Sequence, residues 1–540
     1  MAPSRLSLGI DLSTQSLSAI VLDIDRSEIV ADISLNYLKD ERLNCFGIRE
    51  EDYIIPPRID GEADQPPAMF FAALDAMFDD LRKAIDLGSV SVINVSGQQH
   101  GHIYLNNKAV ERFALLQKDG AEESDLVSLL EVSLAYERAP IWMTSNTARQ
   151  AAFIRDHIGG MGPMIEISGS DAQLRFTGIV ARNIAERFRS SYEDTAVIQL
   201  LSSIIPSILT ANPNIPADYG NGCGMALMNY QGRNWDDRLL NAVSDGLPGG
   251  FEALRRKLPS IVAPDTVVGT ISRYFVRKYG LNPKCKVAAG SGDNPQSKVM
   301  VAGDLLSLGT SIVNMVATEG MTFDMTGAAS AMYDGVGRPF MFGCRTNGAL
   351  VWDKVRVMYG LSRDDYAEAE NALQETPLGR FLVFWQPRVE SFPASDKFDL
   401  WRAYDVPSGL GHDYTGLIES CLAAVYHHSK GFSAQTTGPL YVTGGATGSP
   451  GIMRRIAAIW KRRLIPVERM GAALGAATAA VSALFKSEGE KFDIDSFAKS
   501  VVSRGREIGP SQEDIEAFHG PNQYMERFAE AEMKLISLHR

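Results

Sequence analysis

The feature that most constrains the fold is a strand, a short polar loop and a second strand at the start of the chain. Residues 6–11 alternate and then become apolar, and residues 18–23 (SAIVLD) form a second apolar run. The residues between them, 12–16 (LSTQS), supply hydroxyls, an amide and backbone N–H groups. Two strands joined by so short a loop predict a hairpin with a polar turn.

The second half of the sequence contains the same device. Residues 305–316 read as strand, turn and strand, with Gly309, Thr310 and Ser311 in the turn. Further strand and helix patterns alternate along the chain, with strands at 90–96, 285–290 and 440–443 and helices at 69–83 and 452–463. This alternation predicts an α/β fold in two halves, 1–270 and 271–540.

The composition is that of an ordinary globular protein. The chain has 540 residues, 45% hydrophobic and 22% charged, which excludes a disordered or fibrous chain and allows more than one domain. Its net charge of −12, without a dense stripe of Lys or Arg, predicts no nucleic-acid partner. The stretch 471–485 is short for a membrane span and rich in Gly and Ala, so we expect a buried helix, no membrane partner and a cytoplasmic protein.

Several signatures of other protein classes are missing from the sequence. The five cysteines are widely spaced and include no CxxC pair, which predicts reduced thiols rather than a zinc site or a disulfide framework. There is no GxxxxGK[ST] loop, no GxGxxG after the first strand, no HRD or DFG, no HExxH and no GxSxG. These gaps argue against P-loop enzymes, protein kinases, metalloproteases and α/β-hydrolases.

Two aspartates at predicted strand ends are candidates for chemistry. Asp11 ends the first strand beside the polar loop, where it could hold a hydrated magnesium ion or simply close the hairpin as an Asx-turn. Asp293 follows Gly-Ser-Gly and precedes Asn-Pro, where it could take a proton from a substrate hydroxyl or cap a helix. Position alone leaves both alternatives open.

Three other segments carry weaker signals. Gly444 and Gly445 follow a strand and precede a helix, so they could admit a base or a phosphate, or form only a tight turn. His100 lies in the polar segment 98–102 (QQHGH), which suits sugar hydroxyls, although a lone histidine is more often structural. For Trp142 we expect packing in the core rather than a place at a cleft.

Six short segments follow one another along the chain: 9–16 (GIDLSTQS), 96–101 (SGQQHG), 175–178 (RFTG), 292–295 (GDNP), 307–311 (SLGTS) and 443–446 (TGGA). In this order they resemble the FGGY carbohydrate kinases, and the matches extend from residue 9 to about residue 478. Within the family, the chain looks most like the members that phosphorylate xylulose.

The resemblance implies two ribonuclease-H-like domains of the actin-like ATPase fold, flanking a central cleft. Residues 1–270 would bind the sugar and carry the first phosphate loop, and residues 271–540 would carry the catalytic base, the second phosphate loop and the adenosine site. It also implies ATP-dependent phosphorylation of D-xylulose to D-xylulose 5-phosphate, with magnesium, and an assembly as a homodimer.

The resemblance also assigns roles to residues. Asp293 matches the catalytic base, and Asp11 matches the carboxylate that contacts magnesium through water near the γ-phosphate. The positions that match sugar-binding residues are Gln99, His100, Arg175, Asp293 and Asn294. Those that match phosphate- and nucleotide-binding residues are Ser13, Thr14, Gln15, Gly309, Thr310, Ser311, Tyr366, Gly444, Gly445 and Ser449.

The chain departs from the family pattern at three places. Residues 221–226 read NGCGMA where the xylulose-phosphorylating members have Asp-Gly-Ser-Gly-Met-Asn, and Met143-Thr144 stands where Trp-x-Asp is common. Both departures bear on the identity of the sugar. Ser449 replaces an asparagine often found at the nucleotide site, which bears on nucleotide affinity.

Three other functions are compatible with parts of this pattern. A kinase for another ketose or polyol, such as ribulose, glycerol or gluconate, would need only one altered hydroxyl contact. An actin-like ATPase of the chaperone type would share the hairpin loops and the Gly-Gly turn, but would not need the polar residues 98–100 together with 293–294. A non-catalytic sugar-binding regulator is disfavoured because Asp11 and Asp293 are both present.

Overall fold

The computed structural model describes residues 5–362, 366–433, 437–521 and 523–539. The chain forms two compact units that are not simple halves of the sequence. Unit 1 comprises Met1–Met300, Ala331–Pro339 and Met470–Val501, and unit 2 comprises Val301–Ser330, Phe340–Arg469 and Val502–Arg540. Whether 1–270 and 271–540 each fold as a domain stays a prediction.

Unit 1 is built on a mixed sheet in the order β13-β14-β5-β1-β2-β3, with β15 paired to β5. Its strands are β1 (Leu6–Leu12), β2 (Ser16–Asp23), β3 (Glu28–Asn36), β5 (Val90–Gly97), β13 (Val267–Thr270), β14 (Lys286–Ala288) and β15 (Ser291–Gly292). The predicted hairpin is confirmed, because β1 pairs antiparallel with β2. β1 and β15 both run parallel to β5, so the carboxyl ends of these three strands meet at one edge.

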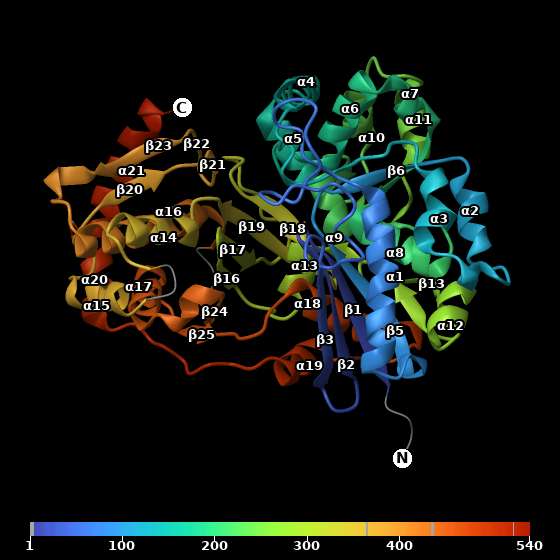
Figure 1. The fold of residues 1–540 in the computed structure, drawn as a ribbon. Helices are drawn as coiled ribbons and strands as arrows, with labels where there is room; N and C mark the ends of the chain where they lie inside the picture. Colours follow the sequence, from blue (N-terminus) through green and yellow to red (C-terminus); the bar gives the residue numbers. More distant parts are fainter. Residues whose placement is uncertain (1–4, 363–365, 434–436, 522, 540) are drawn as a thin grey trace. The chain divides into compact units, whose positions relative to one another are not determined.

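Helices cover both faces of this sheet. On one face, the apolar side chains of β1 share a core with α1 (Pro67–Ala84) and α8 (Leu201–Thr210). Figure 1 shows α1 lying along β2 and β3. On the other face, Ser7 donates a hydrogen bond to the carbonyl of Ala477 in α18 (Ala472–Ser487), the buried helix that the sequence predicted. The sheet is therefore enclosed, as expected of an α/β unit.

Unit 1 also contains short strands and helices outside this sheet. The strands are β4 (Asp64–Gln65), β6 (His102–Asn106), β7 (Ala139–Pro140), β8 (Thr195–Leu200), β9 (Ala217–Asp218), β10 (Met228–Asn229), β11 (Asn234–Trp235), β12 (Ile261–Val262) and β18 (Ser330–Tyr333). The helices are α2 (Ala109–Leu115), α3 (Leu126–Leu130), α4 (Ala148–Ile158), α5 (Met161–Ser168), α6 (Thr177–Arg187), α7 (Arg189–Asp194), α9 (Tyr219–Gly222), α10 (Asp237–Ser244), α11 (Gly250–Lys257), α12 (Arg273–Tyr279), α13 (Asp293–Lys298) and α19 (Ile494–Val501).

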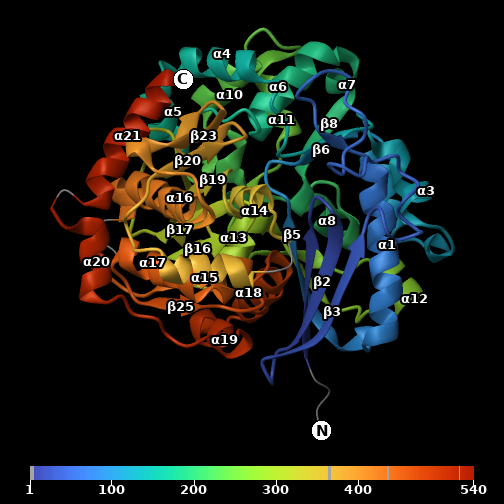
Figure 2. The same ribbon diagram turned by 60° about the vertical axis from the view of Figure 1, so that its left-hand side comes forward.

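Unit 2 contains a second sheet in which β19, β17, β16, β24 and β25 are neighbours in that order. Its strands are β16 (Leu305–Leu308), β17 (Ile312–Ala317), β19 (Pro339–Arg345), β20 (Val383–Gln386), β21 (Glu390–Ser391), β22 (Ala394–Ser395), β23 (Phe398–Arg402), β24 (Leu440–Thr443) and β25 (Leu464–Pro466). Its helices are α14 (Ala349–Met358), α15 (Ala367–Glu375), α16 (Leu410–Ser433), α17 (Pro450–Trp460), α20 (Gln512–His519) and α21 (Tyr524–Leu538). Figure 2 shows α16 between β17 and β20.

Most of the predicted elements are present, but one helix ends earlier than expected. The sequence predicted a helix over 452–463, whereas α17 ends at Trp460 because Lys461 adopts a left-handed conformation with φ of 55°. The cationic residues at the end of that pattern therefore lie beyond the helix, and the carbonyl of Arg463 accepts a hydrogen bond from Leu440. Across the described part of the chain, no helix combines the length and the apolar character needed to cross a membrane.

Candidate active site

The three parallel strand ends of unit 1 bring together residues that are far apart in the sequence. Asp11 in β1 is opposite Ser96 in β5, and Gly97 in β5 is opposite Gly292 in β15. The polar segment 98–100 and Asp293 follow directly after β5 and β15. The aspartates and the Gln-Gln-His segment that the sequence singled out therefore lie at one edge of one sheet.

Asp293 is the first residue of α13, held by hydrogen bonds from its neighbours. Its Oδ1 accepts from the backbone N–H groups of Asn294 and Gln99, at 2.9 and 3.3 Å, and from Asn294 Nδ2 at 3.1 Å. Asn294 Nδ2 also donates to Gln99 Oε1 at 2.9 Å. Burial, and then the nearby charge of Asp11, raise the pKa of Asp293 to about 7. The carboxyl group can therefore exchange a proton near neutral pH.

Asp11 is 8% exposed and ends β1 with an incomplete set of partners. Burial raises the pKa of its carboxyl above the ordinary value, although a hydrogen bond from the Ser13 hydroxyl to Oδ2 opposes the shift. Its Oδ1 is buried without a hydrogen-bond partner among the described residues. A buried carboxylate oxygen in this situation is suited to an ion or a water that the chain does not supply.

Polar side chains from other segments form hydrogen bonds with the loop between β1 and β2. Thr14 Oγ1 donates to Gln98 Oε1 at 3.0 Å, and Gln98 Nε2 donates to Gln65 Oε1 at 2.8 Å. The indole N–H of Trp142 donates to Thr14 Oγ1 at 2.9 Å, and the Trp142 residue is 44% exposed. The expectation that Trp142 packs in the core is wrong, because its N–H has a polar partner at the surface. Gln15 is exposed at the tip of the loop.

His100 is buried beside this group, in a left-handed conformation with φ of 68°. Its Nδ1 lies 2.8 Å from the carbonyl oxygen of Gly224, and its ring lies 4.7 Å from that of Phe176. Burial, and then the charge of Arg175, lower the pKa of His100 to about 3, so the ring is neutral at physiological pH. Arg175, also a predicted sugar-binding residue, therefore lies close enough to His100 to influence it.

Sequence reasoning missed a third aspartate at this edge. Asp218 is fully buried, caps α9, and accepts hydrogen bonds from the Ser291 hydroxyl at 2.6 Å and from Asn221 N at 3.0 Å. Burial raises its pKa to about 7. Ser291 belongs to β15, which leads directly into Asp293. The only available signal was the neighbouring departure at Asn221, whose amide is held by the Ser202 hydroxyl at 2.8 Å.

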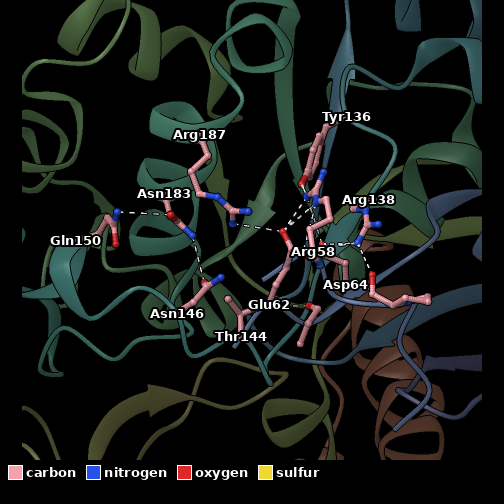
Figure 3. Close-up of polar contacts among 12 residues, drawn as sticks. Arg58, Glu62, Asp64, Tyr136, Arg138, Thr144, Asn146, Gln150, Asn183 and Arg187 are labelled. Carbon is pink, nitrogen blue, oxygen red and sulfur yellow. Dashed lines mark hydrogen bonds and ion pairs between the residues drawn. The ribbon is translucent and has the colours of Figure 1, made fainter. Parts of the chain in front are cut away.

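A network of arginines and carboxylates lies behind the other departure, Thr144 (Figure 3). The Thr144 hydroxyl donates to the carbonyl oxygen of Ala63 at 3.2 Å, which ties it to the segment that contains Glu62 and Asp64. Glu62 is in contact with three guanidinium groups, those of Arg58 at 2.8 Å, Arg187 at 3.3 Å and Arg138 at 3.7 Å. Arg138 also lies 3.5 Å from Asp64. We define these five residues as the arginine–carboxylate network.

In unit 2, the two predicted nucleotide turns lie side by side. β16 and β24 are parallel, with Ser307 opposite Thr443, so the turn at 309–311 and the turn at 444–445 leave the same edge. Gly444 has φ of 105°, and a Cβ there would lie 2.2 Å from the carbonyl oxygen of Leu308, so only glycine fits. The turns expose Thr310 and Gly445 to solvent.

Ser449 follows the second of these turns, and Tyr366 immediately precedes α15. Ser449 caps α17, accepting from Ile452 N at 3.1 Å, and donates to Glu370 in α15. The other oxygen of Glu370 accepts from Gly451 N at 2.8 Å. Tyr366 is 58% exposed, and its ring lies 3.9 Å from the guanidinium carbon of Arg356. Tyr366 therefore presents an aromatic face at the surface.

The predicted site residues thus form two groups. The group in unit 1 contains Asp11, Ser13, Thr14, Gln15, Gln99, His100, Arg175, Asp293 and Asn294. The group in unit 2 contains Gly309, Thr310, Ser311, Tyr366, Gly444, Gly445 and Ser449. Each unit therefore carries a set of polar groups at the strand ends of its own sheet, the usual place for ligands in α/β folds.

Known proteins are similar in sequence to nearly the whole chain. The chain is 25% identical to a xylulose kinase of Schizosaccharomyces pombe over 547 residues, which cover 93% of each protein. It is 27% identical to a xylulose kinase of Rattus norvegicus over 562 residues, which cover 99% of this chain and 98% of the relative. No protein-family model matches the chain.

A solved structure shows the same fold. The crystal structure of xylulose kinase from Rhodospirillum rubrum matches with a TM-score of 0.78 at 16% identity and covers 99% of both chains. This likeness confirms the predicted α/β class and the actin-like fold. The resemblance that the six segments predicted is confirmed as well: the chain is a homologue of the xylulose kinases, with the fold of the FGGY carbohydrate kinases.

Proposed function

We propose that this protein transfers the γ-phosphate of ATP to a hydroxyl of D-xylulose, giving ADP and D-xylulose 5-phosphate. The observation that carries the proposal is Asp293, a carboxyl group at a strand end whose pKa lies near neutral pH and whose neighbours are amides and a neutral histidine. A base of this kind matches a hydroxyl nucleophile, which must lose a proton as it attacks phosphorus.

In this mechanism the sugar lies among Gln99, His100, Arg175 and Asn294, with its reacting hydroxyl at Asp293. One carboxylate oxygen of Asp293 is held by two backbone N–H groups and by the Asn294 amide, which leaves the other oxygen to accept the hydroxyl proton. The proton moves to the carboxylate as the sugar oxygen bonds to phosphorus and the bond to ADP breaks. Since the transition state is mainly charge on oxygens, placement of the two substrates accounts for most of the rate.

Magnesium is the metal that this chemistry requires, and the surroundings of Asp11 fit it. The orphaned, buried Oδ1 of Asp11 is a hard oxygen ligand, and the Ser13 hydroxyl orients the other oxygen. The described residues include no group of three or more potential metal ligands, which agrees with an ion held by one carboxylate, water and the nucleotide phosphates. When bound, the ion neutralises charge on the phosphates.

ATP is the donor because the relatives are kinases, and we assign its binding to both groups of residues. Ser13, Thr14 and Gln15 would face phosphate oxygens from unit 1, as would Gly309, Thr310 and Ser311 from unit 2. The adenosine would lie at Gly444 and Gly445, with Tyr366 near the base and Ser449 beside the helix that follows. The cytoplasm as the place of action and a homodimer as the assembly remain predictions.

A kinase for another ketose or polyol is the second candidate, and a specific observation favours it. Thr144 and Asn221 replace aspartates of the family pattern, and both are occupied within the chain, by the carbonyl of Ala63 and by Ser202 and Asp218. Two contacts that would help to select the sugar are therefore altered.

A coupled assay of ADP release over D-xylulose, D-ribulose, glycerol and gluconate tests the proposal. We expect the highest kcat/KM with D-xylulose, a requirement for magnesium, and almost no turnover in the Asp293→Asn variant. A higher kcat/KM for another substrate would replace D-xylulose while keeping the mechanism. Sugar-independent ATP hydrolysis at the same rate would reject kinase activity altogether.

A further inference from the structure

A chain of hydrogen bonds behind the site fixes the orientation of His100. The hydroxyl of Tyr104 lies 2.9 Å from Nε2 of His102, and Nδ1 of His102 lies 2.9 Å from the carbonyl oxygen of His100. The hydroxyl of Thr177 donates to the same carbonyl oxygen at 3.2 Å. His102, Tyr104 and Thr177 are fully buried. His102 belongs to the polar segment 98–102 that the sequence singled out, whereas Tyr104 and Thr177 had no predicted role of their own.

The hydrogen-bonding properties of the partner groups determine which atoms of Tyr104 and His102 carry a hydrogen. A carbonyl oxygen only accepts, so Nδ1 of His102 must carry a hydrogen. Burial lowers the pKa of His102 to about 4, so the ring is neutral and its Nε2 has a lone pair that accepts from the Tyr104 hydroxyl. Burial also raises the pKa of Tyr104, which keeps that hydroxyl protonated.

The same reasoning applies to His100 itself. Its Nδ1 faces the carbonyl oxygen of Gly224 and must donate, and its neutral ring then has an unprotonated Nε2. Within the described ranges, Nε2 of His100 has no hydrogen-bond partner from the chain. A Cβ on Gly224 would lie 2.6 Å from Cε1 of His100, so glycine is needed for this close approach.

The backbone of His100 needs this support. A φ of 68° is unfavourable for a residue with a side chain, and such conformations persist only where the surroundings fix them. Two donors on the His100 carbonyl, from His102 and Thr177, and the Gly224 contact on its ring supply that constraint. Loss of either donor would let the ring turn away from its present direction.

We propose that His102 and Tyr104 are positioning residues that hold His100 with its Nε2 as an acceptor, so that the substrate must present a hydroxyl hydrogen at that point. This inference rests on the proposed binding of a sugar at His100. The proposal restricts the substrate to polyhydroxy compounds with a hydroxyl that donates a hydrogen bond to Nε2 of His100. A carbonyl or ether oxygen at that point is excluded, because both it and Nε2 are acceptors.

Kinetics of matched variants provide the first test. His102→Phe keeps a ring but removes both hydrogen bonds, and we expect the KM for the sugar to rise about tenfold while kcat and the KM for ATP stay within twofold. His102→Asn keeps an N–H that can donate to the His100 carbonyl and should stay within about threefold of wild type. Tyr104→Phe leaves Nε2 of His102 without its donor and should raise the KM for the sugar about fivefold, between the two His102 variants. His157→Gln, on the exposed side of α4, is the control and should change nothing.

A spectroscopic measurement provides the second test and needs no sugar. In protein labelled with ¹⁵N-histidine, long-range ¹H–¹⁵N spectra should show His100 protonated only at Nδ1, and His102→Phe should mix in the other tautomer. If wild-type His100 is protonated at Nε2, or if His102→Phe and His102→Asn have the same sugar KM, the proposal is wrong. If no sugar is phosphorylated at all, the proposed function fails, and the spectra alone decide the role of His102.

Discussion

Two regions of unit 1 bury carboxylates in different ways, and the difference between them distinguishes a structural network from the candidate active site. In the arginine–carboxylate network, Glu62 and Asp64 are surrounded by three guanidinium groups (Figure 3). At the strand ends, Asp11 and Asp293 have hydroxyl, amide and backbone N–H partners and form no ion pair with a described residue, and the charge of Asp11 raises the pKa of Asp293. Buried charge is costly unless it is paired, so the unpaired region is where a ligand must supply the missing charge.

The pKa values alone would not have made this distinction. Burial, and then the charge of Glu62, raise the pKa of Asp64 to about 6 even though Arg138 and Arg58 oppose the shift. Asp293 reaches about 7 without a cationic neighbour of that kind. Burial would raise the pKa of Glu62 too, but the hydrogen bonds and charge of Arg58 bring it below its ordinary value. A perturbed pKa therefore indicates a functional carboxylate only together with the identity of its partners.

Asp293→Asn should have the largest effect, and on activity only. The variant keeps the shape of the side chain but cannot accept a proton, so we expect kcat to fall by about 10²–10⁴-fold. Its thermal midpoint should equal or exceed that of wild type, because a buried acid that is costly to ionise has been replaced by a neutral amide. Coupled ADP release and thermal unfolding measure the two effects. Turnover within threefold of wild type would remove Asp293 from the role of base.

Glu62→Gln should have the opposite profile, a loss of stability with activity retained. The change leaves the guanidiniums of Arg58, Arg138 and Arg187 without their shared carboxylate. We expect the free energy of unfolding to fall by about 2–4 kcal/mol, less than for a fully enclosed pair because these arginines reach solvent. Urea denaturation measures the loss.

A matched control for that prediction is an exposed ion pair of the same type. Glu193→Gln breaks the pair with Arg189 on α7, where both side chains are at least half exposed. Its cost should stay below about 0.5 kcal/mol, as for other surface pairs. Equal losses in the two variants would show that the network is not a buried structural feature, and a loss of kcat in folded Glu62→Gln would place the network in the site.

The carboxyl group of Asp293 should make activity and stability depend on pH in opposite directions. Since Asp293 must be ionised to accept a proton, kcat/KM should rise about tenfold per pH unit from 5 and level off near 7. The contribution of this carboxyl group to the free energy of unfolding changes with pH in the opposite direction. Between pH 3.8 and about 7 the folded chain retains a proton that the unfolded chain has lost, so this contribution falls as the pH rises.

Two measurements separate these effects. Rates recorded from pH 5 to 8 in buffers of constant ionic strength give the first, and urea denaturation over the same range gives the second. In Asp293→Asn the part of the stability change that belongs to this carboxyl should disappear, whereas the part due to Asp64 should remain up to about pH 6. A kcat/KM that does not change between pH 5 and 7 would contradict the assignment.

The sequence was sufficient for the parts of this comparison that depend on local pattern. Asp11, His100 and Asp293 could be found because each lies at the end of a predicted strand, next to a short polar segment of the sequence. Their place on one edge was not predicted, because the expected division at residue 270 put Asp293 in the other half, whereas β15 pairs with β5 in the structure. The order of six weak segments then gave the resemblance to the FGGY carbohydrate kinases, and the relatives that match nearly the whole chain are xylulose kinases.

The rest depended on contacts between distant segments. Arg58, Glu62 and Arg187 form a network only because the segment before β4 and the end of α6 meet, and none of these residues belongs to a local motif. Asp218 was missed because a lone aspartate before a four-residue helix looks like an ordinary cap. Trp142 was assigned to the core because the sequence could not show that the Thr14 hydroxyl was within reach of its indole.

Asn221→Asp restores a residue of the family pattern and should have the smallest effect of the four. The Ser202 hydroxyl, which now accepts from the Asn221 amide, would have to donate to the new carboxylate, and that carboxylate would lie beside Asp218. We expect the free energy of unfolding to fall by about 1–3 kcal/mol, and by less at low pH, where the added group stays protonated. Asn241→Asp, at an exposed position on α10, is the control and should change stability by about 0.5 kcal/mol or less. If Asn221→Asp is as stable as wild type but changes the preferred sugar, the amide at this position determines specificity. If the variant is destabilised and the preference is unchanged, the amide is there because a fourth carboxylate cannot be buried at this edge beside Asp11, Asp218 and Asp293.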